Sequence, residues 1–290
     1  MSAEAAVGAM RNAEAREGAA ATAKAVRHIV MLSGGKDSTA LALYLREKQP
    51  DTDFEYLFCD THKELPETYE YLARIEARLG RTVVRLASNH GERGFDHFLK
   101  IYGGFLPSPQ ARWCTRLLKI EPFEKYVGDD PTRLYVGLRA DERRTGYIST
   151  KENIEAVFPF KDDGIDRAGV MRILEDSGVG LPAYYEWRSR SGCYFCFFQQ
   201  KGEWVRLRER HPDLYQLAKG YEKEDEGYTW AQEESLSDLE APERRAEILE
   251  RERVRKERLA ARRRPKTLAQ AYGFEDPEEE EGAGCLICHL

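Results

Sequence analysis

The chain has 290 residues, of which 41% are hydrophobic and 33% charged, and a formal net charge of -6 at pH 7. This length allows one sizeable core and an attached smaller unit, because domains commonly contain about 100 to 200 residues. The sequence has neither an apolar run of the roughly 18 residues that span a membrane nor an apolar signal-peptide core, which excludes secreted and membrane-spanning classes. We therefore expect a cytoplasmic protein with no membrane partner.

Strand and helix patterns alternate along the first half of the chain. Residues 1–26 are rich in Ala, Glu and Gly without an apolar stripe, which predicts a mobile leader. Strands are then predicted at residues 28–32, 54–59, 82–86 and 133–137, and helices at 38–47 and 67–79. Such alternation is typical of βαβ units and predicts an α/β fold with a doubly wound parallel sheet over residues 27–165. Ligands of such sheets bind beyond the carboxyl ends of the strands.

The second half of the chain has a different character. Residues 166–230 are aromatic and compatible with helices, which predicts a helical, cysteine-bearing appendage near the strand ends. The region 231–290 combines a charged helix with a cysteine-containing tail. Its stretch 241–264 is almost all Arg, Glu and Ala with a thin apolar stripe, so we expect an exposed helix there.

The most informative segment is Ser-Gly-Gly-Lys-Asp-Ser at residues 33–38, between a predicted strand and a predicted helix. Gly34 and Gly35 allow a tight turn that brings backbone N–H groups close to an anion, and the helix adds the positive end of its dipole. Lys36 supplies a cation. Further donors to phosphate are the hydroxyl groups of Ser33, Ser38 and Thr39. The segment predicts a phosphate cradle that lacks Walker A spacing; the alternative is an ordinary Gly turn with a Ser cap.

This segment resembles the SGGxDS signature of the PP-loop ATP pyrophosphatases, within the adenine nucleotide alpha-hydrolase-like fold. Two further motifs resemble the phosphoadenosine phosphosulfate reductase branch, in order along the chain: Cys-Asp-Thr-His-Lys-Glu-Leu-Pro-Glu-Thr at 59–68 and Gly-Leu-Arg-Ala-Asp-Glu-Arg-Arg at 137–144. The resemblance covers residues 28 to 196. It implies that residues 33–38 hold pyrophosphate and that Arg139 contributes a cation to the ATP site, with Arg143 and Arg144 as further candidates.

Two carboxylates are candidates for binding Mg²⁺. Asp37 lies inside the phosphate loop and would repel the ligand unless a metal ion bridges them, and Asp60 follows the next strand. For Asp60, a cap of the turn before Thr61 is an equal alternative. Together with Lys36 and the loop amides, Mg²⁺ would neutralise the departing pyrophosphate. Lys36, Asp37 and Asp60 are therefore the predicted catalytic residues.

The six cysteines indicate metal binding or thiol chemistry more than a disulfide framework. Two CxxC motifs supply four thiolates, enough for tetrahedral Zn²⁺: Cys193, Cys196, Cys285 and Cys288. The family resemblance implies a [4Fe–4S] cluster, because iron–sulfur members of the branch combine a later CxxC with a cysteine at the place of Cys114. Both metals stay open, as does a small buried residue for Cys114. Cys59 is expected in the core.

The function follows from the same resemblance. A single cysteine at position 114, where adenylylsulfate reductases have a Cys-Cys pair, most resembles the enzymes of bacterial DNA phosphorothioation. This implies cleavage of ATP to AMP and pyrophosphate, activation of a backbone phosphate of DNA for sulfur insertion, and a cysteine desulfurase and other phosphorothioation components as partners. Alternatives are a reductase of adenylylsulfate or phosphoadenylylsulfate and a non-catalytic nucleotide- or metal-binding regulator.

Basic residues near the cysteines support a nucleic-acid partner. They are Arg112, Arg116, Lys119, Arg188 and Arg190. If the two cysteine segments meet, these side chains predict a cationic rim, with aromatic residues between them, that suits a phosphodiester backbone or exposed bases. The equal alternative is that they balance the charge of thiolates.

Overall fold

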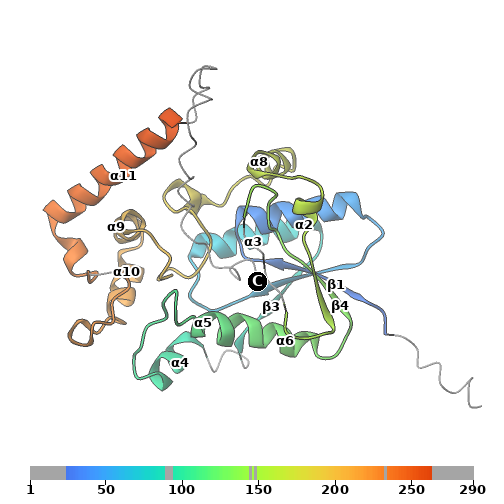
Figure 1. Ribbon diagram of the computed structural model, residues 1–290, viewed down its shortest axis with the longest axis horizontal. Helices are drawn as coiled ribbons and strands as arrows, with labels where there is room; N and C mark the ends of the chain where they lie inside the picture. Colours follow the sequence, from blue (N-terminus) through green and yellow to red (C-terminus); the bar gives the residue numbers. More distant parts are fainter. Residues whose placement is uncertain (1–23, 89–93, 144–145, 147–148, 232–233, 263–290) are drawn as a thin grey trace, which may run out of the picture.

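The computed structural model describes residues 24–88, 94–143, 146, 149–231 and 234–262, with the backbone alone at 259–262. At its centre is a parallel sheet with the strand order β3-β2-β1-β4-β5 (Figure 1). The strands are β1 (Arg27–Leu32), β2 (Phe54–Cys59), β3 (Val83–Leu86), β4 (Thr132–Tyr135) and β5 (Ile154–Val157). The predicted α/β class and doubly wound parallel sheet are confirmed. The direction of winding reverses between β1 and β4, where such sheets bind ligands.

Strand β5 was not predicted from the sequence. It has four residues at the edge of the sheet, and only Ile154 among them is buried. A strand this short and exposed leaves neither a continuous apolar run nor a clear alternation. The other four strands agree with the predicted ranges to within two residues at each end.

Helices cover both faces of the sheet, as Figure 1 shows. On one face lie α2 (Lys36–Lys48), α3 (Pro66–Leu79) and α8 (Arg167–Asp176); on the other lies α6 (Glu121–Val127). Strand β1 serves both cores, because its successive side chains point to opposite faces: Val30 and Leu32 pack toward α2, and Ile29 and Met31 toward α6. Both faces of β1 are therefore buried. The loop that follows β1 is anchored to a strand that is packed on both sides.

Helix α8 lies in the region 166–230 that the sequence placed with the appendage. Its Val170 and Leu174 are buried in the core formed by β1, β2 and α2. The packing of the α/β layer therefore continues past residue 165.

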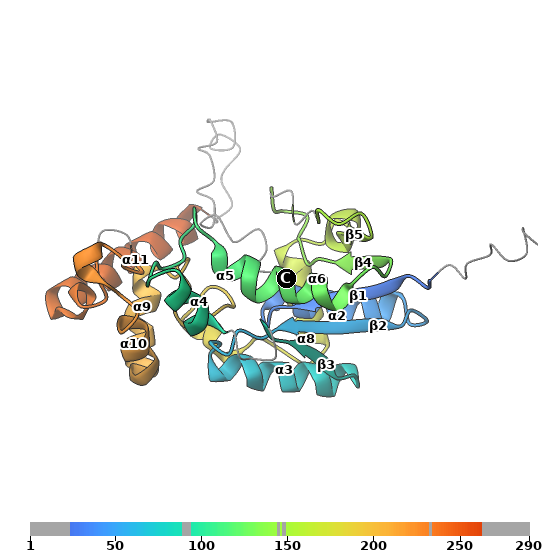
Figure 2. The same ribbon diagram turned by 90° about the horizontal axis from the view of Figure 1, so that it is seen from below.

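The remaining helices form a second core beside the sheet. Its elements are α4 (Phe95–Ile101), α5 (Trp113–Thr115), a π-helical turn (Arg116–Ile120), α9 (Lys201–Arg210), α10 (Pro212–Lys219) and α11 (Pro242–Arg262), with 3-10 turns at Ala183–Glu186, Glu224–Glu226 and Asp238–Glu240. The short α7 (Pro159–Asp162) packs instead in the core on the α2 side of the sheet, where Phe160 is buried. In Figures 1 and 2, α9, α10 and α11 lie together at one end of the sheet. This confirms the predicted helical C-terminal part.

Aromatic side chains fill this second core. Phe95 of α4 stacks on Trp113, and Phe195 stacks on Trp230. Helix α11 is mostly exposed, as predicted, and buries Ile248 against this core. Cys59 is buried in the core on the α6 side of the sheet, also as predicted.

Among the helices in the described part of the chain, none combines the length and apolar character needed to cross a bilayer. The leader predicted at 1–26 is described only from residue 24. Cys285 and Cys288, with the rest of the predicted tail, lie outside the described residues, as does Arg144.

Candidate phosphate site

The segment between β1 and α2 forms a tight loop that only glycine permits at Gly34. Its φ is +71°, and a Cβ atom there would lie 2.6 Å from Thr68 Cγ2. The loop is closed by its own hydroxyl groups: Ser38 Oγ accepts a hydrogen bond from Ser33 N at 3.1 Å, and Thr39 Oγ1 donates to the Gly35 carbonyl at 2.8 Å. Ser38 and Thr39 are fully buried, so they shape the loop in this structure. Their direct contact with phosphate stays a prediction.

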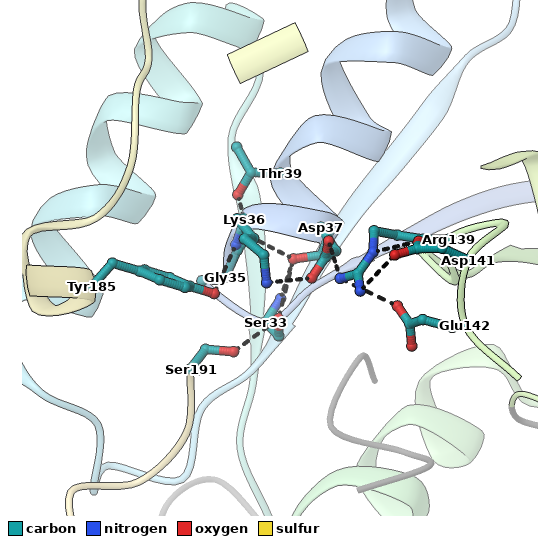
Figure 3. Close-up of polar contacts among 12 residues, drawn as sticks. Ser33, Gly35, Lys36, Asp37, Thr39, Arg139, Asp141, Glu142, Tyr185 and Ser191 are labelled. Carbon is teal, nitrogen blue, oxygen red and sulfur yellow. Dashed lines mark hydrogen bonds and ion pairs between the residues drawn. The ribbon is translucent and has the colours of Figure 1, made fainter. Parts of the chain in front are cut away.

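Asp37 lies between two cations at the start of α2 (Figure 3). Its Oδ2 accepts a hydrogen bond from Lys36 Nζ at 3.1 Å, and its Oδ1 accepts one from Arg139 Nη1 at 3.1 Å. The Arg139 guanidinium, only 6% exposed, also contacts Asp141 at 2.9 Å and Glu142 at 3.4 Å. Burial lowers the pKa of Arg139, but these carboxylates together raise it above its ordinary value.

This arrangement brings together residues about 100 positions apart in the sequence. A Cβ atom at Gly137 would lie 3.0 Å from the Asp37 carbonyl oxygen, so glycine allows the segment after β4 to approach α2. Arg139 is thereby delivered to the phosphate loop at the point where the strand order reverses. The charge of Asp37 is balanced by protein cations, which is a second way, besides Mg²⁺, to make an acidic residue tolerable in a phosphate site.

Asp60, at the end of β2, caps a turn. Its Oδ1 accepts hydrogen bonds from the His62 backbone N–H at 2.8 Å and from the Tyr69 hydroxyl at 2.8 Å. His62 has φ +56°, and the short side chain of Asp60 stabilises this left-handed turn. The turn-capping alternative for Asp60 is present in the structure, and its role as an Mg²⁺ ligand stays a prediction.

A segment from the helical region covers the phosphate loop. The Tyr184 hydroxyl donates to the Gly34 carbonyl at 2.6 Å, and the Lys36 backbone N–H donates to the Tyr185 hydroxyl at 3.4 Å. Ser191 Oγ lies 3.2 Å from Ser33 Oγ (Figure 3). Because Ser191 is two residues before Cys193, the cysteine-bearing segment is attached directly to the phosphate loop.

Cys193 lies in a buried polar cluster behind this loop. Its Sγ is 3.2 Å from Thr61 Oγ1 and 3.8 Å from Glu64 Oε1, and Thr61 donates to the same Glu64 oxygen at 2.9 Å. Burial raises the pKa of the Glu64 carboxyl. Burial, and then the charge of Glu64, raise the pKa of the Cys193 thiol well above its ordinary value. Both effects favour the protonated form of the Cys193 thiol in this arrangement.

Arg188 holds the cysteine segment in place. Its guanidinium donates to the Gly192 carbonyl at 3.0 Å and to the Cys193 carbonyl at 2.7 Å, and the residue is only 2% exposed. The sequence placed Arg188 on an exposed cationic rim, and this part of the prediction is wrong. The side chain is long enough to reach back to its own chain, where buried carbonyl groups require donors.

The two cysteine segments meet through aromatic residues. Phe95 packs on Trp113, which precedes Cys114, and its ring centroid is 4.2 Å from that of Phe195, between Cys193 and Cys196. On the outer side, the guanidinium groups of Arg112 and Arg190 lie over the ring of Phe198, at 5.7 Å and 4.8 Å from its centroid. The predicted convergence of the basic residues is therefore found for these two.

The described residues do not assemble the predicted metal site. Within them, no group of three or more His, Cys, Asp or Glu side chains is placed to hold a metal ion. Cys114 packs at the margin of the second core, and Cys193 is engaged by Thr61 and Glu64. The described residues by themselves complete neither a [4Fe–4S] site nor a Zn²⁺ site; two predicted ligands, Cys285 and Cys288, lie outside them, and both metals stay predictions of the sequence.

The family model for the phosphoadenosine phosphosulfate reductase domain matches residues 27–163. This range contains all five strands, the phosphate loop and Arg139. Residues 27–163, just under half of the chain, are thus similar to that domain, and the motifs at 33–38, 59–68 and 137–144 lie inside the matched range. We refer to this range as the reductase-like domain because of that similarity.

Three curated relatives share part of the chain. Uncharacterized protein MJ0066 of Methanocaldococcus jannaschii is 27% identical over 220 residues, and uncharacterized protein MJ0973 of the same organism is 28% identical over 194 residues. These matches cover 70% and 63% of this chain but 44% of each relative. An uncharacterized 37.8 kDa protein of Escherichia phage 186 is 25% identical, with 66% of this chain and 73% of that protein covered. This chain thus spans less than half the length of the archaeal relatives.

Two solved structures are distant in sequence and in shape. Phosphoadenylyl-sulfate reductase from Candida auris, in a phosphate complex, has a TM-score of 0.47 and 18% identity, covering 62% of this chain and 86% of that chain. The U34-tRNA thiolase NcsA from Methanococcus maripaludis, with its [4Fe–4S] cluster, has a TM-score of 0.38 and 16% identity, covering 70% and 73%. Similarity this remote transfers neither ligand nor activity to this chain.

Some residues around the reductase-like domain were not singled out from the sequence. Glu64 lies inside a recognised motif, but nothing in its spacing distinguishes a buried carboxyl from an exposed one. The sequence also gave no sign that the hydroxyl groups of Tyr184, Tyr185 and Ser191 contact the loop. The two tyrosines were noticed only as aromatic residues near the CxxC motif. Their partners lie about 150 positions away in the chain.

Proposed function

We propose that this protein is a cytoplasmic enzyme that splits ATP to AMP and pyrophosphate and so activates a phosphate group for sulfur insertion. The observation that carries the proposal is the attachment of the cysteine-bearing segment to the phosphate loop, with Ser191 Oγ 3.2 Å from Ser33 Oγ. An activated phosphate formed at the loop is then a short distance along one segment from Cys193. The reductase-like domain gives the general reaction class.

The loop supports the first half of the reaction. An oxygen of the acceptor phosphate attacks the α-phosphorus of ATP, a new P–O bond forms, and the bond to the β-phosphate breaks. Pyrophosphate leaves with the electron pair, and Lys36, the loop amides and the helix α2 N-terminus are the groups that stabilise its charge. Asp37 accepts a hydrogen bond from Lys36 and one from Arg139, and so positions both side chains beside the site. Mg²⁺ is the proposed ion for the remaining phosphate charge.

The second half replaces oxygen by sulfur. With hydrosulfide as the simplest donor, a P–S bond forms, the P–O bond to AMP breaks, and AMP leaves with that oxygen while the sulfur loses its proton. With a protein persulfide as donor, a second thiol must reduce the S–S bond after transfer, and the CxxC at 193–196 offers a thiol pair for this purpose.

For the acceptor we propose a backbone phosphate of DNA, and for the sulfur donor a cysteine desulfurase acting with other phosphorothioation components. Support comes from the resemblance at Cys114 and from Arg112 and Arg190, which lie over Phe198 between the two cysteine segments. Two guanidinium groups around an aromatic ring suit phosphates and exposed bases.

The proposal is tested by product analysis. ATP with Mg²⁺ and the protein should give AMP and pyrophosphate on chromatography; ADP and orthophosphate as the main products contradict the proposal. Radiolabelled sulfur from cysteine should then enter DNA in the presence of ATP and the desulfurase. The double variant Arg112→Ala with Arg190→Ala should weaken DNA binding and reduce its salt dependence, while the matched removal of a charge at Arg81, on the sheet edge, leaves both unchanged.

A second candidate is a reductase of adenylylsulfate or phosphoadenylylsulfate. The observation in its favour is the matching family model, which describes the domain of phosphoadenosine phosphosulfate reductases. Against it, the tail lacks the Glu-Cys-Gly-Leu-His motif of phosphoadenosine phosphosulfate reductases. Labelled adenylylsulfate converted to free sulfite, with no label in DNA, would move the assignment to this reaction.

A further inference from the structure

Besides Tyr184, two side chains from outside the reductase-like domain reach its phosphate loop. The Tyr185 hydroxyl accepts a hydrogen bond from the Lys36 backbone N–H at 3.4 Å, and the Lys36 ammonium lies 5.4 Å from the centre of the Tyr185 ring. Ser191 Oγ lies 3.2 Å from Ser33 Oγ, and a Cβ atom at Gly35 would approach it to 2.8 Å. Figure 3 shows both hydroxyl groups turned toward the loop.

The groups that these hydroxyls contact are those that a phosphate would use. The Lys36 N–H is the first amide of α2, and amides at a helix N-terminus have no partner within the helix and bind anions. A 3.4 Å hydrogen bond is long and weak, so an anionic phosphate oxygen replaces the Tyr185 oxygen at little cost. A tyrosine or serine hydroxyl is both donor and acceptor, so each can then turn its proton toward the same phosphate.

The segment that carries these hydroxyls contacts the loop at its start and is hydrogen-bonded within itself at its end. Next to Tyr185, the fully buried Tyr184 donates to the Gly34 carbonyl at 2.6 Å. Further along, Arg188 clamps the carbonyl groups of Gly192 and Cys193. Three of its side chains, Tyr184, Tyr185 and Ser191, contact the loop, so a ligand bound at the loop would change contacts at both ends of the stretch 184–191.

We propose that Tyr185 and Ser191 are phosphate-binding residues that complete the cradle from above, and that phosphate binding thereby orders the segment 184–193 that ends at Cys193. The proposal rests on the proposed function only in taking a pyrophosphate group as the ligand. It adds a second part of the chain to a site that the loop motif assigned to residues 33–38 alone.

The probe is inorganic pyrophosphate, bound to the full chain and followed by calorimetry. Tyr185→Phe and Ser191→Ala should each weaken binding by about tenfold, the usual effect of losing a hydrogen bond to a charged group. Tyr215→Phe is the matched control, since it removes a hydroxyl that donates to the Leu236 carbonyl at 2.6 Å in the second core. Unchanged binding in both loop-facing variants overturns the proposal, and tighter binding does too, because it would show that the hydroxyls obstruct the site.

Hydrogen exchange supplies a readout that does not depend on activity. In the unaltered chain, pyrophosphate should slow amide exchange over 184–193 as well as in the loop; in the Tyr185→Phe, Ser191→Ala double variant at saturating ligand it should slow exchange in the loop alone. Slowing confined to the loop of the unaltered chain would reject the ordering of the segment. If the protein binds pyrophosphate through Tyr185 but releases no AMP from ATP, this inference stands and the proposed function is wrong.

Discussion

Asp37 is the residue whose surroundings differ most from what its motif suggests. Between Lys36 and Arg139, it is a nearly buried anion that orients both cations of the phosphate site. The sequence predicts that Asp37→Ala removes activity and leaves the fold intact, because the side chain faces the ligand. The structure shows that the same side chain also balances the buried Arg139 guanidinium.

We therefore expect Asp37→Ala to lower the free energy of unfolding by about 1–3 kcal/mol as well as to abolish ATP cleavage, because a buried charge-assisted hydrogen bond is lost. Lys36→Ala should abolish cleavage with a smaller loss of stability, since Asp37 keeps Arg139 as its partner. Denaturant unfolding measures the loss of stability in each of the two variants. Lys125→Ala, at an exposed position of α6, is the control, and equal stability of all three variants would contradict the pairing.

Gly34 offers a separate test of the loop. Gly80 has a similar left-handed conformation, with φ +63°, but a Cβ atom there would meet nothing within 4 Å. Gly80→Ala should thus cost about 1–2 kcal/mol of conformational strain alone, and Gly34→Ala should cost more, because its Cβ overlaps Thr68 Cγ2. Adding Thr68→Ser to Gly34→Ala removes that methyl group. It should recover only the part of the stability loss by which Gly34→Ala exceeds Gly80→Ala. Equal unfolding free energies for the two alanine variants would show that the overlap is not real.

At the scale of elements, α11 is attached to the second core by a few defined contacts. Glu234 accepts hydrogen bonds from Arg244 Nε at 2.5 Å and Nη2 at 2.8 Å, and Lys201 of α9 contacts the same carboxylate. The hydrogen bonds from Arg244, opposed by burial and reinforced by Lys201, lower the pKa of Glu234 to about 2. Beyond these contacts, Ile248 provides the main buried apolar anchor of the helix.

This pKa has a predictable effect on stability. Because the folded value lies below the ordinary value of 4.5, the pair stabilises the fold above that pH and loses its contribution as the pH falls from about 4.5 to about 2. Glu234→Gln should be less stable than the unaltered chain at pH 7, and the difference should shrink through that window. Unfolding titrations at several pH values measure it, with Glu243→Gln, an exposed residue in the first turn of α11, as control. A difference that is independent of pH would refute the pairing.

At the scale of the whole molecule, two cores of different origin share one functional surface. The sheet supplies the phosphate loop, and the aromatic core supplies the cysteine segments that pack through Phe95. The site therefore depends on the docking of the helical part against the reductase-like domain. A protein with the sheet alone would have the loop without Tyr185, Ser191 and the thiols.

The metal content is a prediction at this scale, since its ligands come from segments far apart. The family resemblance predicts brown protein after anaerobic purification, with iron and sulfide that Cys114→Ser, Cys193→Ser or Cys196→Ser each removes. Metal analysis and visible absorbance measure this. Colourless protein with one zinc, together with a harmless Cys114→Ser, would establish the site of two CxxC motifs in its place.

Local patterns in the sequence were enough for the α/β class, four of the five strands and the tight turn at residues 33–38, whose binding of phosphate stays a prediction. These features depend on neighbours: alternating apolar residues make a buried strand, and Gly34 permits a turn that no other residue allows. For Arg139, it was the resemblance of the Gly-x-Arg segment to the reductase branch that singled out the residue. Each of these signals is complete within a few residues of chain, so it can be recognised without knowledge of the fold.

Only the tertiary structure decided which distant segments meet. It placed α8 on the sheet, buried Arg188 against its own backbone, put Glu64 beside Cys193 and laid Tyr185 and Ser191 on the loop. Such contacts result from the packing of whole helices and from the need of buried polar groups for partners, wherever in the chain those partners lie. Neither condition leaves a trace in local spacing, because a tyrosine that binds a loop and one that fills a core look the same in sequence.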